Sequence, residues 1–184
     1  GTVTLSTETI AANYSDTAAN LAAAFSGITT HTGNLTISET STATIAELVT
    51  INAATAGTVT LSTETIAANY SDTAVNLAAA FSGITTHTGT IAITGTNPTI
   101  TQLNNISGAT SGVVTATISD TATNLATLTT ASTDAITITI SDGVAATIAE
   151  LVTINNATSG TVTLNSQTIA ANYSDTAVNL AAAF

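Results

Sequence analysis

Five aspartates in this sequence have a setting that could hold a divalent cation. Four come directly before a threonine that opens a helical pattern, and the fifth comes five residues before one: Asp16, Asp72, Asp120, Asp175 and Asp142. Carboxylate oxygens are ligands for calcium, and stacked repeats would bring them together at the strand spacing of roughly 4.8 Å. We favour the alternative of helix capping, because the chain lacks a DxDxDG loop and a Gly-Gly-x-Gly-x-Asp repeat.

A second set of residues could bind a regular surface through hydroxyl groups. Thr-x-Thr pairs occur in five expected strands and would form rows on a flat sheet: Thr2/Thr4, Thr58/Thr60, Thr115/Thr117, Thr137/Thr139 and Thr161/Thr163. Regularly spaced hydroxyl and methyl groups can order water, so the rows predict a surface that binds ice or a glycan. The competing interpretation is that threonine suits the solvated face of any strand.

The two histidines, His31 and His87, occupy equivalent positions in a duplicated TTHTG loop. They have no carboxylate nearby, which makes them poor metal ligands, and we expect them in a solvated loop. Serine, histidine and aspartate all occur, but none stands in a setting typical of a catalytic triad. The sequence therefore predicts no catalytic residue, no cofactor apart from the calcium alternative, and no enzyme.

A five-residue pattern sets the positions of these residues, and it occurs seven times. It reads Thr, a small or branched apolar residue, one variable residue, then Asn, Glu or Gln, and finally Leu. The copies begin at Thr17, Thr44, Thr73, Thr99, Thr121, Thr147 and Thr176, with spacings of 27, 29, 26, 22, 26 and 29 residues. A period in this range is typical of solenoid proteins.

Each copy predicts a short helix with a strand before it. In three copies the threonine and the third residue after it fit the capping box that opens a helix: Thr44/Glu47, Thr99/Gln102 and Thr147/Glu150. The other four copies have Asn in that position, a weaker version. Before each helix, apolar residues alternate with polar ones, which is typical of a strand with one buried face. Glycine or a polar turn precedes most of these strands.

The predicted fold class is α/β: a solenoid of about seven strand-plus-short-helix repeats with a stacked parallel β-sheet. One array covers residues 1–184, with repeats at approximately 1–32, 33–56, 57–88, 89–111, 112–134, 135–159 and 160–184. Residues 1–32, 57–88 and 160–184 are near-duplicates, which we name A repeats, and residues 33–56 and 135–159 are B repeats. Each A repeat has an extra TETIAANY-like segment, expected as a wider turn or a second short strand. Neither end has a polar capping repeat, which predicts part of a longer or polymeric protein.

Composition excludes several classes of partner. The 184 residues include no Lys or Arg and eleven Asp or Glu, which gives a net charge of −11. A chain without cations cannot neutralise phosphates, so we expect no nucleic acid and no anionic membrane surface as partner. No apolar run is long enough for a transmembrane helix. The absence of cations favours an exported, extracellular or cell-surface product.

The runs SDTAANLAAAF, ISDTATNLATL and TIAELVTINAATAGTVTL resemble repeats of very large secreted or cell-surface proteins of bacteria, particularly cyanobacterial and marine ones. The resemblance extends over the whole chain and implies an extracellular structural or adhesive role without catalysis. Unpaired strand edges at both ends predict end-to-end self-association into a homopolymer. We therefore expect a component of a surface filament, sheath, surface layer or adhesin. The alternatives are the threonine-ladder binding module and a calcium-stabilised adhesin stalk.

Overall fold

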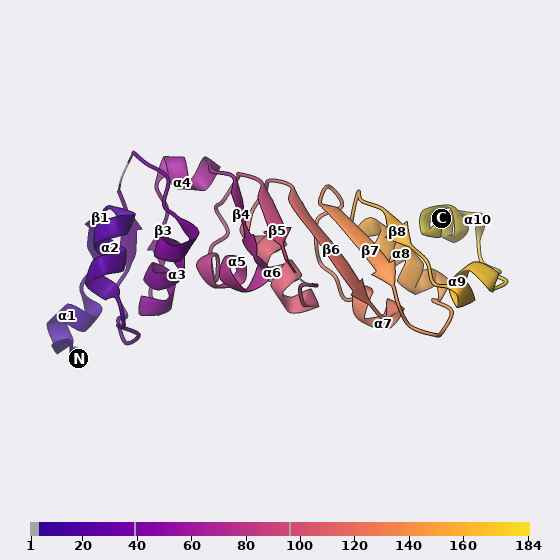
Figure 1. The fold of residues 1–184 in the computed structure, drawn as a ribbon, viewed down its shortest axis with the longest axis horizontal. Coiled ribbons are helices and arrows are strands. Elements are labelled where there is room, and N and C mark those ends of the chain that lie inside the picture. The colour runs from indigo at the N-terminus through magenta and orange to yellow at the C-terminus, as the bar shows by residue number, and fades with distance from the viewer. Residues whose placement is uncertain (1–3, 39, 96) are drawn as a thin grey trace.

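The computed structural model describes residues 4–38, 40–95 and 97–184 as an elongated α/β molecule. Figure 1 shows the helices and strands following one another in chain order along the long axis, with the two ends of the chain at opposite ends of the molecule. The described residues form two parallel sheets and ten helices. The predicted α/β class and the predicted parallel strands are confirmed.

The strands pair in chain order, and every pair is parallel. The first sheet contains β1 (Tyr14–Asp16), β2 (Leu35–Ile37) and β3 (Val59–Thr60). The second contains β4 (Tyr70–Thr73), β5 (Ile91–Thr94), β6 (Val114–Asp120), β7 (Ala135–Ile140) and β8 (Val162–Thr163). The expectation of one stacked sheet is therefore wrong, because the ladder of paired strands is interrupted between β3 and β4.

Seven helices begin at the recurring threonine, as predicted. They are α2 (Ala18–Phe25), α3 (Ile45–Ala54), α5 (Ala74–Ala80), α6 (Ile100–Ala109), α7 (Ala122–Leu125), α8 (Ile148–Asn156) and α10 (Ala177–Ala183). In each of them the threonine hydroxyl accepts the backbone N–H three residues later. The capping box is complete in α3, α6 and α8. Because an N-cap stabilises a helix by about 1 kcal/mol, each helix start is encoded locally.

The A repeats depart from the predicted plan of one strand and one helix. The segment expected as a turn or strand begins with a five-residue helix: α1 (Thr7–Ala11), α4 (Thr63–Ala67) and α9 (Ser166–Ala170). In the first two A repeats a second strand then follows the helix, as β1 and β4. Since α4 separates β3 from β4 along the chain, the sheet divides there. Of the strand predicted at Val3 and Leu5, Val3 lies outside the described residues and Leu5 lies outside any strand.

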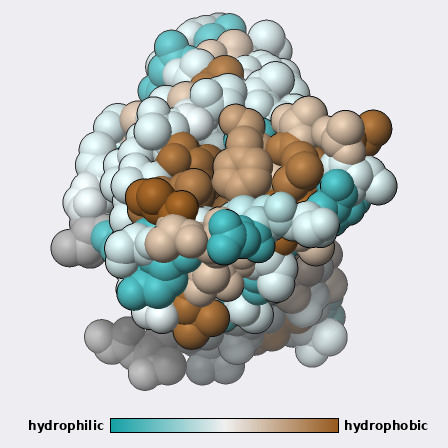
Figure 2. Space-filling model, turned by 90° about the vertical axis from the view of Figure 1, so that its right-hand side faces the viewer, coloured by the Kyte–Doolittle hydropathy of each residue, from teal (hydrophilic) through white to brown (hydrophobic). Residues whose placement is uncertain are grey.

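The core lies between the sheets and the capped helices. Along β6, Val114, Ala116 and Ile118 are buried while the residues between them are exposed. Fully buried leucine and isoleucine side chains contribute about 1.5–3 kcal/mol each, and they make up most of the large core residues of this chain. At the C-terminal end Ile169 and Phe184 remain exposed. Figure 2 shows a hydrophobic group on this end of the molecule, bordered by hydrophilic residues.

Close approach between successive repeats explains the glycines that precede the strands. A Cβ placed on any of five glycines would lie 1.8 to 2.3 Å from a backbone carbonyl oxygen of the preceding repeat: Gly33, Gly57, Gly89, Gly112 and Gly160. No side chain fits at these distances. The sequence pattern indicated turns at these positions, but the constraint is contact between neighbouring repeats.

Candidate functional site

The predicted calcium ligands that precede the threonines serve as helix caps. The Asp16 Oδ1 atom accepts the Thr17 N–H at 2.7 Å and the Asn20 side-chain amide at 2.8 Å. The same pair of hydrogen bonds recurs at three other repeats, for Asp72, Asp120 and Asp175. Asn at the third position is thus the partner of the preceding aspartate, and not a weaker capping box. Sequence reasoning missed this Asp-Thr-x-x-Asn unit.

These hydrogen bonds stabilise the ionised carboxylates. The Asn20 amide and the Thr17 N–H lower the pKa of Asp16 from its ordinary value. Backbone N–H groups and asparagine amides likewise lower the pKa of Asp72 and Asp175. The carboxylates therefore stay charged near the N-terminal ends of their helices, where the helix dipole favours negative charge.

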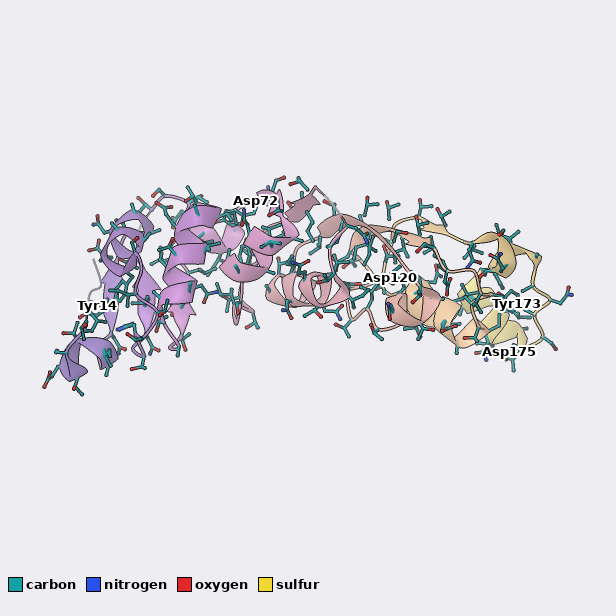
Figure 3. All side chains as sticks on the ribbon, turned by 60° about the horizontal axis from the view of Figure 1, so that its bottom comes forward. Tyr14, Asp72, Asp120, Tyr173 and Asp175 are labelled. Atoms are coloured by element: carbon teal, nitrogen blue, oxygen red, sulfur yellow. The ribbon has the colours of Figure 1, made fainter. Side chains whose placement is uncertain are left out.

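Strand pairing does not bring these carboxylates together. Asp16 lies opposite Ile37, Asp72 opposite Ile93 and Asp120 opposite Ile140. Figure 3 shows Asp72, Asp120 and Asp175 at separate points along the molecule. Within residues 4–38, 40–95 and 97–184 there is no group of three or more His, Cys, Asp or Glu that could hold a metal ion. The expected approach of carboxylates at the strand spacing is wrong, because the register is set by buried apolar rows.

Asp142, the fifth candidate, bridges two repeats. Its Oδ2 atom accepts the Ala122 N–H at 3.3 Å, and its Oδ1 atom accepts the Asn165 amide at 2.9 Å. Ala122 is the first residue of α7, so this carboxylate also satisfies a free N–H at the start of a helix.

Threonine rows exist, but they are shorter than predicted. Thr117 pairs with Thr137 and Thr139 with Thr163, all on the solvated face of the second sheet. Thr115 instead lies between Ala92 and Ala135. The pairs on β6 and β7 are therefore offset by two residues. The buried pairs of Ile118 with Ile138 and of Ala116 with Ile136 fix this register.

The other ladder threonines do not extend this surface. Thr60 pairs with Thr36 in the first sheet, which is separate from the second, and Thr58 is exposed beside it. Thr161 is exposed just before β8, and Thr4 is exposed outside any strand. Thr2 lies outside the described residues. The largest hydroxyl surface is accordingly formed by Ser119, Thr117, Thr137, Thr139 and Thr163 on β6, β7 and β8, which we name the hydroxyl patch.

The histidines are buried, so the expectation of a solvated loop is wrong. His31 and His87 are each only 1% exposed. The His87 ring packs against Tyr70 and Phe81 with ring centroids 5.5 and 4.9 Å away. Its Nε2 lies 3.0 Å from the Ala68 carbonyl oxygen, which can only accept, so Nε2 carries the proton. Burial lowers the pKa of His87.

Asp134 is a buried acid that comes directly before β7. It is 1% exposed and occupies the position of His31 and His87 in its own repeat. Its Oδ2 atom accepts the Ser107 hydroxyl at 2.6 Å and the Ala131 N–H at 3.0 Å, and its Oδ1 atom accepts the Val114 N–H at 2.8 Å. Three hydrogen-bond donors satisfy this buried side chain. Because Ser107 belongs to the preceding repeat, Asp134 links successive repeats.

A concave apolar surface lies at the N-terminal end. The cavity measures about 250 Å³, and its lining includes Leu5, Thr9, Tyr14, Leu21, Ala24 and Phe25, a surface that we name the leading face. Tyr14 lies near this end of the molecule and Tyr173 near the other (Figure 3). The leading face carries no catalytic grouping: its polar lining is hydroxyl groups and the capping pair of Asp16 with Asn20.

No helix within the described part of the chain is long and apolar enough to cross a membrane. No protein-family model, curated protein or solved structure matches this chain.

Proposed function

We propose that the chain is a non-catalytic structural repeat array, an α/β solenoid that forms part of an extracellular bacterial filament, sheath, surface layer or adhesin. Its mechanical continuity comes from backbone hydrogen bonds that run from repeat to repeat along the long axis. The observation that carries this proposal is the order of the parallel strands, which within each of the two sheets pair with the next strand in the sequence. An array stacked in this way can gain further repeats without any change in the contacts between neighbouring repeats.

Side chains add further connections between successive repeats. The Asn34 N–H is bound by the Asn13 side-chain oxygen at 2.8 Å, and the Thr58 N–H by the Asn34 side-chain oxygen at 2.9 Å. The Asn69 side-chain oxygen likewise accepts the Thr90 N–H at 2.9 Å. Such bonds use neutral groups, so they do not depend on cations that the chain lacks. They suit a surface component exposed to variable salt, because hydrogen bonds between neutral groups are not screened as ion pairs are.

Both ends of the array present apolar surface, the leading face at one end and Ile169 with Phe184 at the other. We propose that other repeats cover these ends in the assembly and that the native product polymerises end to end. Immunogold labelling of the source cells should place the protein in fibrous or layered surface material. Label confined to the cell interior, or micrographs of the native product showing only dispersed monomers, would refute the proposal.

The hydroxyl patch supports a second candidate function, binding of ice or a glycan. Its threonines are paired across neighbouring parallel strands, which places successive hydroxyl groups roughly 4.8 Å apart. A thermal-hysteresis assay and a glycan array test the two ligands. The Thr117→Val/Thr139→Val double variant is the control, since it keeps the strand shape and removes two hydroxyl groups. Zero thermal hysteresis together with no glycan retained would eliminate this function.

A further inference from the structure

The leading face has two internal counterparts that a B repeat contacts, and the one in the second A repeat is covered. Residues 57–88 differ from residues 1–32 only in Val75 for Ala19. Leu5, Thr9, Tyr14 and Ala24 are half-buried or exposed, whereas their counterparts in this second A repeat are buried: Leu61, Thr65, Tyr70 and Ala80. Leu21 and Phe25 are buried in both repeats. Tyr14 is 36% exposed and Tyr70 is 8% exposed. The difference comes from what stands in front of each repeat, because the sequences are the same.

The B repeat of residues 33–56 covers the second A repeat, and it does so with specific hydrogen bonds. The Tyr70 hydroxyl donates to the Ala43 carbonyl at 2.8 Å, and the Ala43 N–H donates to the Thr65 hydroxyl at 3.1 Å. The Asn52 amide donates to the Ser82 carbonyl at 2.8 Å, beyond the end of α5. Helices α3 and α5 lie in contact beneath these bonds.

The third A repeat repeats these contacts with the other B repeat. The Tyr173 hydroxyl donates to the Ala146 carbonyl at 2.7 Å, and the Ala146 N–H donates to the Thr168 hydroxyl at 2.9 Å. The Asn155 amide donates to the Ala182 carbonyl at 3.1 Å. Two independent junctions in one chain therefore show the same partner on the same surface, with the same three groups making the contact.

His31 and His87 differ in their hydrogen bonds. Both nitrogens of this buried ring have no hydrogen-bond partner among the described residues. Both nitrogens of His87 are paired, with Ala68 and Thr110. The unpaired His31 ring packs against Tyr14 and Phe25, which line the open cavity. Both histidines stand in a TTHTG sequence, while the repeats that follow them differ. The His31 ring therefore contacts the leading face through its packing against Tyr14 and Phe25 and not through a hydrogen bond.

We propose that the leading face is the docking site for a B repeat, which seats on it as residues 33–56 seat on the second A repeat. This proposal rests on the proposed function, the stacking of repeats into an array. It adds the kind of repeat that covers the N-terminal end. The B repeat supplies a carbonyl for the Tyr14 hydroxyl and an N–H for the Thr9 hydroxyl. Its asparagine reaches the carbonyl groups at the end of α2.

The sequence explains why a B repeat fits and an A repeat does not. The asparagine of both B repeats stands eight residues after the cap threonine, as Asn52 after Thr44. The same position in an A repeat is phenylalanine, as Phe81 after Thr73. A second copy of this chain would present its third A repeat to the leading face, and that repeat lacks the asparagine. The asparagine of the B repeat therefore determines that a B repeat, and not an A repeat, stands ahead of an A repeat.

The test joins a copy of residues 33–56 ahead of residue 1 of the full chain. Amide hydrogen exchange should slow roughly tenfold or more in residues 14–16 and in α2, to the rates of β4 and α5 in the same molecule. Imidazole NMR, simplified by the presence of only two histidines, should show His31 adopting the hydrogen-bonding pattern of His87. Tyr14→Phe should raise the opening equilibrium of this segment about 2- to 10-fold in the extended protein and leave it unchanged in the 184-residue chain, since only the extended protein makes the hydrogen bond.

The matched controls are a scrambled extension of the same composition and the Tyr70→Phe variant, which removes the equivalent hydroxyl at an existing junction. Unchanged exchange of residues 14–28 in the extended protein would overturn the proposal. Equal protection by the scrambled extension would show a non-specific apolar contact instead, and protection through dimers of the unextended chain would assign the face to a second copy. Small-angle scattering of the unextended chain tests the rod shape separately, so a failure of stacking is distinguishable from a failure of this assignment.

Discussion

Replacement of Gly112 by alanine tests the close stacking of repeats most directly. Gly112 begins the β6 repeat, and a Cβ at this position would lie 2.2 Å from the Gly89 oxygen and 2.7 Å from the Thr88 oxygen. Both are backbone atoms, at the junction of the two repeats ahead of Gly112, so neither can turn away as a side chain could. Carbon and oxygen atoms need about 3.5 Å, and the two repeats must therefore separate by about 1 Å or more.

The expected loss has two sources. Inserting a methyl group into a packed interior costs about 1–3 kcal/mol. Separation of the repeats also weakens the hydrogen bonds that Thr110 makes to the Gly89 carbonyl and to the Gly112 N–H, at 2.8 and 2.9 Å, and each is worth about 1 kcal/mol. We expect the free energy of unfolding to fall by about 3–5 kcal/mol. For a chain of this length the melting temperature should drop by roughly 6–20 °C.

Gly108→Ala provides a matched control four residues away. Gly108 lies in α6, and a Cβ there would meet nothing within 4 Å. Alanine in a helix interior is favoured over glycine by about 0.5–1 kcal/mol, so this variant should be slightly more stable. Urea unfolding followed by circular dichroism measures both variants. A Gly112→Ala protein as stable as the unaltered chain would show that successive repeats do not stack at backbone contact distance.

Three further predictions concern buried or charged groups. Because burial lowers the pKa of His87, the unfolded chain binds a proton at this residue more readily than the folded chain. The free energy of unfolding should therefore fall as the pH drops below about 6.5. The His87→Gln variant should lose part of this pH dependence, measured by urea unfolding at several pH values. Asp134→Asn replaces one acceptor oxygen by an NH₂ group, which then faces either the Val114 N–H or the Ser107 hydroxyl and the Ala131 N–H, and it should cost about 1–3 kcal/mol by the same assay. Asp134→Glu should not restore the stability, because the site is closed and the side chain is longer. Chelation by EDTA should leave the melting temperature unchanged, since the aspartate caps already accept hydrogen bonds, and a clear drop would restore the calcium-stabilised alternative.

Local patterns predicted the helices well. Each of the seven recurring threonines caps a helix, because the capping hydrogen bonds join residues only three apart and need no tertiary partner. The alternation of apolar and polar residues in β6 and β7 also predicted the correct buried face. Both signals depend on near neighbours in the chain, which a single sequence displays.

Positions that depend on contact between repeats were predicted poorly. The histidines and Asp134 look like loop residues in the sequence, yet each is buried where one repeat packs on the next. The offset of the threonine pairs arises from the register between β6 and β7, which buried isoleucines decide. The division of the sheet followed from α4, a helix too short for a periodic signal.

The sequence alone determined the period, the helix starts, the strand faces and the absence of cations, because each is carried by residue types at fixed local spacing. Only the tertiary structure decided which glycines pack against the backbone of a neighbouring repeat and which polar groups are buried. It also decided which surface of each repeat must be covered by the repeat ahead of it. Those properties arise from atoms far apart along the chain, as in the hydrogen bond between Tyr70 and Ala43, 27 residues apart. No short window of sequence contains both partners of such a contact.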